Sequence, residues 1–167
     1  FHLNGFQPGN PEISPDRSRR AAGSPLPATT DVLIVGCGSA GLTLAAQMAA
    51  FDDISTVIIE RKPGPMQRGQ ADGVSCRSME MFAAFGFAHK VWNEAYQVNE
   101  TTFWKPDPDA PQNIIRTGRI QDVEDGLSEM PHVILNQARV HDMYLEVMAN
   151  SAARLVPDYS RQLVGLE

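Results

Sequence analysis

The glycine-rich stretch GCGSAG at residues 36–41 constrains the fold of this chain more than any other feature. It directly follows the short apolar run DVLIV at 31–35, and it precedes a segment in which apolar and small residues recur at helical spacing from Leu42 to Ala49. A second β-branched run, TVIIE at 56–60, comes next. This order predicts a strand, a helix and a parallel strand, with the first strand buried on both faces. A G-x-G-x-x-G sequence in the first turn of such a unit is typical of Rossmann-like dinucleotide-binding domains.

The loop and the end of the second strand supply the expected cofactor contacts. Three glycines allow a tight turn, close approach of a pyrophosphate and close packing of the helix on the strand. Backbone N–H groups at the helix start can then face the anion; the alternative is a purely structural turn. Cys37 is expected to fill this turn rather than to act as a reactive thiol. The expected contacts from the loop are Gly36, Gly38, Ser39, Ala40 and Gly41.

Glu60 ends the second strand, where a carboxylate can accept a hydrogen bond from an adenosine ribose. An acid at this position disfavours a 2′-phosphate, so FAD or NAD is expected in this site rather than NADP. Arg61 follows directly and either lies beside the adenosine or is solvated.

Composition narrows the function classes. The chain has 167 residues, 43% hydrophobic and 20% charged, which suits one globular domain or a piece of a larger one. A formal net charge of -6 without a Lys/Arg cluster disfavours nucleic acid and anionic membrane as partners. No apolar run approaches the roughly 20 residues of a membrane span, and no secretion signal is recognisable, so a cytoplasmic location is expected. His132 and His141 have no further ligands at metal spacing, so no metal site is expected.

The remaining chain is less regular. Residues 1–30 are rich in proline and glycine and predict an extended arm. Proline interrupts the segment 99–120, which we expect to form an edge strand plus a loop at most. The other expected elements are a helix near 75–85 ended by Gly86, a short helix within 87–96, a strand at 131–136, an amphipathic helix through Val140–Met148 and a further strand opening at 162–167.

Asp72 raises a separate question, because it lies between Gly69 and Gly73 just ahead of the helix expected near 75–85. An aspartate in that place often caps the helix or forms an Asx-turn, with its side chain accepting from the backbone at positions 74 and 75. A carboxylate facing a ligand is the other interpretation. The residues alone leave both open.

Three segments resemble the phenol hydroxylase group of flavin-dependent aromatic monooxygenases: GCGSAGLTLA, IIERKPGPMQRGQADGVSCRSMEMF and PHVILNQARVHDMYLEVM. The resemblance extends over FHLNGF, TFWKPDP and VEDGLSEMPHVILNQARVHD, and so over nearly the whole chain. It implies an α/β fold, a Rossmann-like FAD-binding domain of the aromatic hydroxylase type that is incomplete at its C-terminus. That domain would occupy residues 31–167 and include the first interleaved segment of the substrate domain at about 97–135.

The same resemblance implies a reaction in which NADPH reduces bound FAD and O2 supplies the oxygen placed ortho to a phenol hydroxyl. The expected conversion is 3-hydroxybenzoate to 3,4-dihydroxybenzoate, with phenol as an alternative substrate. The full-length protein would act on a small phenolic substrate as a homodimer, and the 167-residue chain alone is expected to be inactive and to bind FAD weakly or not at all. An NAD-dependent dehydrogenase would explain GCGSAG and Glu60 but not GQADG or NQAR. A non-enzymatic nucleotide-binding module stays open for the chain itself.

The resemblance also implies roles for single residues. Asp72 would be catalytic, accepting a hydrogen bond or proton from the substrate hydroxyl and so pushing the ring toward phenolate, the form an electrophilic oxygen attacks best. His132 would lie in the substrate pocket and bond the phenol hydroxyl or a carboxylate. Arg77 would reach the FAD phosphates, for which arginine is well suited. The residues implied on the flavin side are Gln70, Ala71 and Gln137.

Overall fold

The computed structural model describes residues 24–166. Most of the expected arm, residues 1–23, lies outside the described residues, and the described part of it, 24–30, forms no helix or strand. The chain divides into two compact units, one of residues 1–69 and 137–167 and the other of residues 70–136. Each unit is described by itself below.

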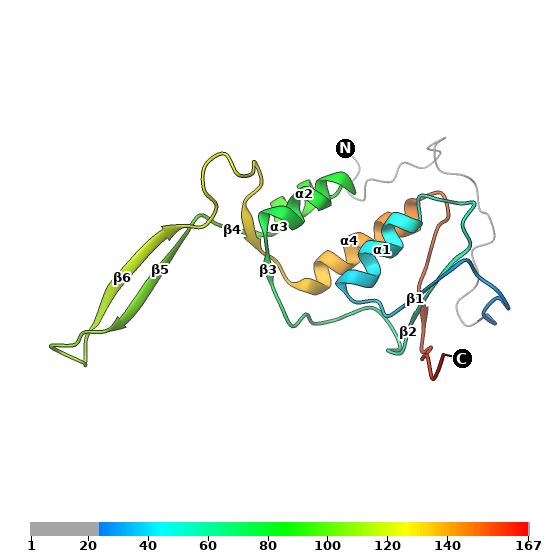
Figure 1. Cartoon of the computed structure of the whole chain (residues 1–167), viewed down its shortest axis with the longest axis horizontal. Helices are drawn as coiled ribbons and strands as arrows, with labels where there is room; N and C mark the ends of the chain where they lie inside the picture. The colour runs from blue at the N-terminus through cyan, green and yellow to red at the C-terminus, as the bar shows by residue number, and fades with distance from the viewer. Residues whose placement is uncertain (1–23, 167) are drawn as a thin grey trace. The chain divides into compact units, whose positions relative to one another are not determined.

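The first unit is a parallel sheet with two helices (Figure 1). Strand β1 (Val32–Val35) leads through helix α1 (Ser39–Met48) into strand β2 (Thr56–Glu60), and the two strands pair in parallel with Ile34 opposite Ile58. The expected strand, helix and parallel strand are therefore confirmed. Helix α4 (Gln137–Asn150) and strand β8 (Asp158–Tyr159) complete the unit, in the sheet order β1-β2-β8.

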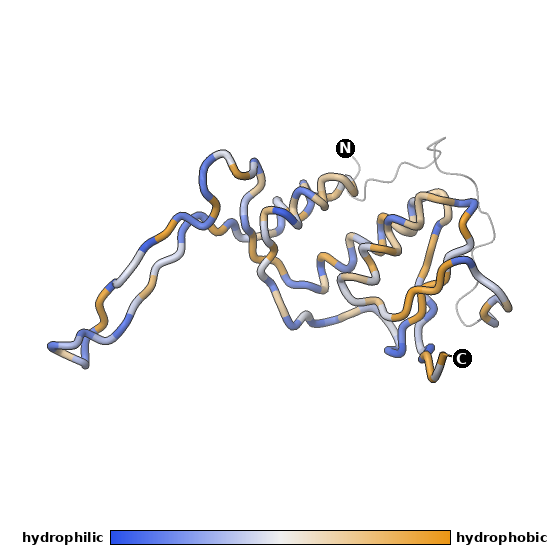
Figure 2. Tube along the Cα trace, viewed as in Figure 1, coloured by the Kyte–Doolittle hydropathy of each residue, from blue (hydrophilic) through white to orange (hydrophobic). Residues whose placement is uncertain are grey.

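The core of this unit lies between the sheet and the paired helices α1 and α4. Figure 2 shows continuous hydrophobic colour along β1 and β2, and small residues on α1 let the helix lie close to this surface: Ala45 and Ala46 are buried. Tyr144 and Met148 of α4 are buried as well, as the periodicity through Val140–Met148 indicates. The Thr43 hydroxyl donates to the Tyr144 hydroxyl at 2.9 Å, so a hydrogen bond joins the two helices in addition to their apolar contact.

The expectation that β1 is buried on both faces is wrong. Leu33 and Val35 are 46% and 54% exposed, whereas Val57 and Ile59, their partners on β2, are buried. In the described chain β1 is the edge of its sheet, because β2 pairs with it on one side and no described strand pairs with it on the other. An apolar run predicts burial but does not say which neighbours provide it.

The second unit contains a small antiparallel sheet in the order β3-β7-β4. Its strands are β3 (Gly73–Val74), β4 (Tyr96–Val98) and the central β7 (His132–Ile134). Helices α2 (Cys76–Ala84) and α3 (Ala88–Glu94) join β3 to β4, as expected for this part of the chain.

Helix α2 ends in a Schellman motif. Gly86 has φ +81°, a conformation that costs an L side chain roughly 1–2 kcal/mol. The Gly86 N–H donates to Ala83 O and the Phe87 N–H donates to Phe82 O, both at 3.0 Å. The Phe82 and Phe87 rings stack with their centroids 4.8 Å apart, which supplies the apolar contact that accompanies this motif.

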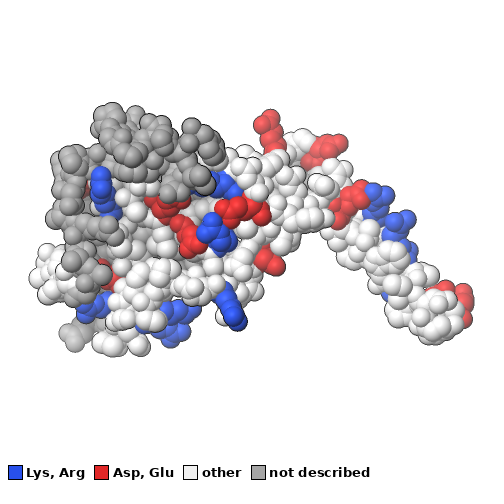
Figure 3. Space-filling model, turned by 180° about the vertical axis from the view of Figure 1, so that it is seen from behind, with Lys and Arg blue, Asp and Glu red and all other residues white. Residues whose placement is uncertain are grey.

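The segment 99–120 differs from its expectation. It forms a two-stranded antiparallel hairpin of β5 (Glu100–Pro106) and β6 (Ile114–Gln121), with an irregularity between Phe103 and Trp104. The three prolines of this segment did not prevent strand pairing, because Pro106 ends β5, and Pro108 and Pro111 lie in the turn between the strands. Figure 3 shows acidic and basic side chains on this hairpin, and within residues 24–166 its two strands have no pairing partner besides each other.

The chain end also differs. Residues 162–166 form no strand, and the third strand of the parallel sheet is instead the short β8, where Ile59 and Glu60 of β2 pair with Asp158 and Tyr159. Between residues 24 and 166, no helix combines the length and the apolar character needed to cross a membrane.

Candidate functional site

The three loop glycines have three different structural requirements. Gly36 has φ +100°, which the tight turn requires. A Cβ on Gly41 would lie 2.0 Å from Gly36 O, so only glycine lets α1 approach β1 this closely. A Cβ on Gly38 would meet nothing within 4 Å. The protein itself therefore does not demand glycine at 38, whereas a ligand lying against this backbone would.

The start of α1 suits an anion. Gly38 is the N-cap residue, it provides no side-chain cap, and the first turn of α1 holds no acidic residue. The first N–H groups of a helix have no acceptor within the helix, and the helix dipole places partial positive charge beside them. These features fit the pyrophosphate of a dinucleotide.

Both oxygens of the Glu60 carboxylate accept backbone hydrogen bonds, from the N–H of Cys37 and from the N–H of Lys62, each at 2.9 Å. Burial alone would raise the pKa of Glu60, but these bonds and the nearby charges of Lys62 and Arg61 outweigh it, so the pKa lies below its ordinary value. The carboxylate is thus ionised at neutral pH and clamps the glycine loop to the end of β2. Each oxygen keeps a lone pair that can accept from a ribose hydroxyl.

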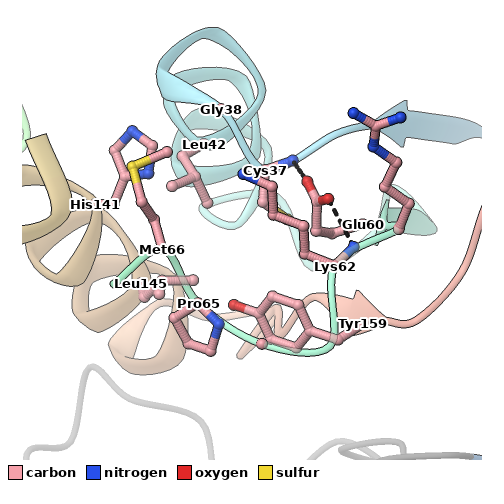
Figure 4. Close-up of a pocket in the computed structure, with 12 residues that line it drawn as sticks. Cys37, Gly38, Leu42, Glu60, Lys62, Pro65, Met66, His141, Leu145 and Tyr159 are labelled. Atoms are coloured by element: carbon pink, nitrogen blue, oxygen red, sulfur yellow. Dashed lines mark hydrogen bonds between the residues drawn. The ribbon is translucent and has the colours of Figure 1, made fainter. Parts of the chain in front are cut away.

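A cavity of about 220 Å³ opens beside this clamp (Figure 4). The glycine loop and Glu60 lie on one side of it, and Pro65 and Tyr159 lie on the other. Arg61, Lys62, Met66 and His141 also contribute to its wall. The mixture of apolar side chains and a few oriented polar groups is typical of a small-molecule site.

Two groups at this cavity are held neutral. Burial, reinforced by the Glu60 charge, raises the pKa of the Cys37 thiol to about 12. Cys37 therefore stays protonated at neutral pH and cannot serve as a nucleophile, in agreement with the space-filling role expected for it. Burial first, then the negative charges of nearby groups such as Glu60 and Asp142, raises the pKa of Tyr159 to about 12, so its hydroxyl remains a donor.

Ser39 and Gln137, both expected at the cofactor, are brought together although 98 positions separate them. Gln137 Nε2 donates to Ser39 Oγ at 3.1 Å, and His141 Nε2 lies 2.9 Å from the same oxygen. His141 was not among the residues expected at the cofactor, yet its side chain is buried beside Ser39, with an exposed fraction of 1%. Its position four residues after Gln137, on the apolar stripe of α4, was the available signal.

Asp72 does not cap α2. The cap is Ser75, whose hydroxyl accepts from the Ser78 N–H at 3.4 Å. The Asp72 side chain is exposed, and within residues 24–166 its carboxylate has no hydrogen-bond or ion-pair partner. Its backbone oxygen accepts from the Leu135 N–H at 2.7 Å, which fixes the main chain. The capping interpretation, open from the residues alone, is therefore wrong.

His132 lies on β7 in the same small sheet. Its Nδ1 is 2.8 Å from Asp122 Oδ2, and its Nε2 lies 3.4 Å from the point where a Cβ on Gly73 would stand. The imidazole thus covers the residue next to Asp72. Asp122 was not recognised in the sequence, because only the fold brings it to β7.

The remaining predicted cofactor residues lie on the surface. Arg77 is in the first turn of α2, as expected, with a side chain 91% exposed and an ion pair to Glu80 at 3.5 Å. Gln70 and Ala71 are exposed in the loop before β3, and Arg61 is exposed at the end of β2. Ala40 lies in the first turn of α1, where its N–H can join an anion site. Their cofactor roles stay predictions.

Comparison with known proteins agrees with this geometry. Residues 29–161 match the family model described as an FAD binding domain. The chain is 61% identical over its whole length to 3-hydroxybenzoate 4-monooxygenase of Comamonas testosteroni, and 40% identical over 80% of its length to the FAD-dependent monooxygenase terD of Aspergillus terreus. It spans 26% and 22% of the lengths of these two relatives.

Solved structures show the same fold. The flavin-dependent monooxygenase PieE, in complex with FAD and substrate, superposes with a TM-score of 0.61 over 81% of this chain and 24% of its own, at 20% identity. The p-nitrophenol 4-monooxygenase PnpA of Pseudomonas putida DLL-E4 gives 0.63 over 78% of this chain and 32% of its own, at 15% identity. With a glycine loop, a carboxylate at the end of β2 and a family match over most of its length, the chain belongs to the FAD-binding domain family of flavoprotein monooxygenases.

Proposed function

We propose that this chain is the FAD-binding part of a monooxygenase that hydroxylates a phenol ortho to its hydroxyl, using NADPH and O2. The substrate we propose is 3-hydroxybenzoate, converted to 3,4-dihydroxybenzoate. Support for the substrate comes from the 61% identity to 3-hydroxybenzoate 4-monooxygenase. Phenol is the second candidate, because a phenol 2-monooxygenase of Aspergillus fumigatus is 33% identical over 66% of the chain.

The observation that carries the proposal is the uncommitted carboxylate of Asp72. Ser75 caps the neighbouring helix, so the fold makes no use of the Asp72 side chain. An exposed acid held on a fixed backbone beside a histidine is suited to accept a proton or a hydrogen bond from a substrate hydroxyl. Such an interaction raises the electron density of the ring at the carbon to be hydroxylated.

His132 is suited to the other end of the substrate. Its bond to Asp122 holds the ring in one orientation and directs Nε2 away from that carboxylate. A nitrogen so directed can donate to the carboxylate of a hydroxybenzoate. Simple phenol has no such group, so His132 is expected to matter more for 3-hydroxybenzoate.

FAD, when bound, supplies the redox and oxygen-transfer chemistry. This chain would hold its pyrophosphate on the first turn of α1 and its adenosine ribose at Glu60. Arg77 would leave its ion pair with Glu80 and bind a phosphate oxygen of the cofactor. This change costs little, because an exposed ion pair contributes little stability.

The test is Asp72→Asn in the full-length enzyme. Loss of a general base or a strong acceptor is expected to lower the rate of 3-hydroxybenzoate hydroxylation by about 10²- to 10⁴-fold, with FAD content unchanged. Product formed, NADPH consumed and flavin absorbance should be measured together. Ser75→Ala is the matched control, since it alters the same loop without removing the acid.

Two outcomes would contradict the proposal. Unchanged hydroxylation by Asp72→Asn would remove the role of the carboxylate. Absence of flavin absorbance in the full-length protein, together with NAD binding, would favour an NAD-dependent dehydrogenase instead.

A further inference from the structure

The Ser39 hydroxyl is held by two side chains of another helix. Ser39 is the first residue of α1, whereas Gln137 and His141 lie on α4. Gln137 Nε2 donates to Ser39 Oγ at 3.1 Å, and His141 Nε2 lies 2.9 Å from it. A hydroxyl offers one donor and two acceptor positions, so two of the three positions are occupied from α4 and one is left.

His141 is neutral at neutral pH. Burial is the main cause that lowers its pKa; Lys62, after β2, lowers it further, and Asp142, on its own helix, opposes the shift. No charged side chain of α1 contributes. One ring nitrogen of the neutral imidazole therefore carries a proton and the other does not.

Which nitrogen carries the proton decides what Ser39 can do. If the proton is on Nδ1, then Nε2 must accept the Ser39 proton, and Ser39 keeps no donor. If the proton is on Nε2, then the Ser39 oxygen accepts from both Gln137 and His141, and its own proton is left to point elsewhere. An anion at the first turn of α1 favours the second arrangement, because a hydrogen bond to a charged oxygen is stronger than one between neutral groups.

We propose that His141 is a positioning residue for the cofactor phosphate: as an Nε2–H donor to Ser39, together with Gln137, it leaves the Ser39 hydroxyl proton directed at a phosphate oxygen. This inference rests on the proposed binding of FAD by this chain. His141 touches no phosphate itself. It acts through Ser39, and it couples the glycine loop to Gln137, the glutamine expected on the flavin side.

A donor directed in this way has a specific signature. Removing one hydrogen bond to a charged group is expected to lower affinity about 10- to 100-fold, which is roughly 1.4–2.8 kcal/mol at about 1.4 kcal/mol per factor of ten. The loss should occur for ligands that carry the phosphates and should be absent for adenosine. If His141 only supported the fold, its replacement would weaken the binding of FAD, ADP and adenosine alike.

The experiment measures binding of FAD, ADP and adenosine to the deflavinated full-length enzyme carrying Ser39→Ala, His141→Leu or His141→Gln. Ser39→Ala and His141→Leu are expected to weaken FAD and ADP about 10- to 100-fold while leaving adenosine unchanged. His141→Gln places an amide that can donate at the same site, and it should recover most of the loss. The double variant Ser39→Ala with His141→Leu should bind as Ser39→Ala does, because both changes remove the same interaction.

The outcomes separate the inference from the proposed function. An unmodified enzyme that binds no FAD would overturn the proposed function. Two results would overturn the inference alone, provided that the unmodified enzyme binds FAD. In the first, His141→Leu has unchanged affinity for FAD and ADP; in the second, it loses affinity for adenosine as strongly as for ADP. If His141→Leu does not fold, the ADP affinity of Ser39→Ala tests the inference. An unchanged ADP affinity in Ser39→Ala would show that the Ser39 hydroxyl does not bind phosphate, so His141 would have no donor to position.

Discussion

The glycines of the loop show how one residue type meets different physical demands. At Gly41 a methyl group would collide with the carbonyl oxygen of Gly36 in the same chain. At Gly38 the space beside the backbone is open, and φ is -75°, which any residue adopts. Packing therefore explains Gly41, whereas packing places no demand for glycine at Gly38, which agrees with the cofactor contact proposed there.

We predict opposite consequences for the two alanine variants. Gly41→Ala should destabilise the fold by about 1–3 kcal/mol, the range for overpacked sites, because neither Gly36 O nor α1 can move freely. Gly38→Ala should cost less than about 1 kcal/mol, mostly from the poorer N-cap, and should act mainly on FAD affinity. Chemical denaturation and flavin titration of both variants check this. Equal destabilisation by the two would contradict the assignment.

Glu60 makes the stability of the first unit depend on pH. Its folded pKa lies below the ordinary 4.5, so its stabilising contribution is fully present above about pH 4.5 and is lost as the pH falls through the folded pKa. Glu60→Gln keeps one acceptor oxygen and removes the other. It should therefore lower the denaturation midpoint at neutral pH, and the difference from the unmodified chain should shrink as the pH falls below 4.5 and through the folded pKa. A constant difference across this range would show that the carboxylate is not the group responsible.

At the scale of elements, capping separates two residues that the sequence alone could not distinguish. Asp72 and Ser75 both precede α2 and both can cap a helix. The structure assigns the cap to Ser75 and the backbone contact with Leu135 to Asp72.

Ser75→Ala is thus expected to destabilise the chain by about 0.5–1 kcal/mol, at the low end for caps because its bond is 3.4 Å long. Asp72→Ala should change stability by less than about 0.5 kcal/mol, the range for ordinary surface positions. Thermal or urea unfolding of the two single variants measures this. A larger loss in Asp72→Ala would restore the capping role of the aspartate.

Local signals explain which elements were predictable. Helix α2 and its end at Gly86, and the strand-helix-strand unit around GCGSAG, follow from period, capping and glycine, all of which act within a few residues. The hairpin at 100–121 was missed because strand pairing in it is decided by cross-strand partners rather than by the prolines. Strand β8 was missed because two residues carry no period, and only pairing with β2 defines it.

The same distinction applies to the site. The glycines and Glu60 could be recognised because the motif carries their spacing in the sequence. The bonds from Gln137 and His141 to Ser39, and from Asp122 to His132, depend on helix and strand packing over 10 to 102 positions. No local pattern encodes such contacts, so the sequence indicated Ser39, Gln137 and His132 but neither the bond between Ser39 and Gln137 nor the partners His141 and Asp122.

In the whole molecule, one compact unit is inserted in the sequence between two parts of the other. Residues 70–136 form a unit of their own between β2 and α4, and the polypeptide then returns to the parallel sheet as β8. The expected substrate-domain segment, about 97–135, falls inside that unit. The residues proposed for phenol, Asp72 and His132, belong to it, whereas the glycine loop and Glu60 belong to the other.

The size of the cavity beside Glu60 limits how much of FAD it can enclose. The cavity beside Glu60 has about 220 Å³, below the roughly 300–1,000 Å³ of sites that enclose drug-sized ligands, so it suits an adenosine-sized portion of FAD. We predict that the purified chain carries no stoichiometric yellow flavin. Excess ADP should still stabilise it, by about 1.4 kcal/mol at ten times the dissociation constant, since only the folded chain would bind.

Absorbance of the purified chain and its unfolding with and without ADP measure these two effects. Glu60→Ala is the matched control, because it removes the proposed ribose acceptor and the loop clamp while the other residues that line the cavity are unchanged. It should abolish the stabilisation by ADP. Stoichiometric flavin in the purified chain would instead mean that residues 1–167 hold the whole cofactor, and that the wall beside Glu60 is only part of a larger site.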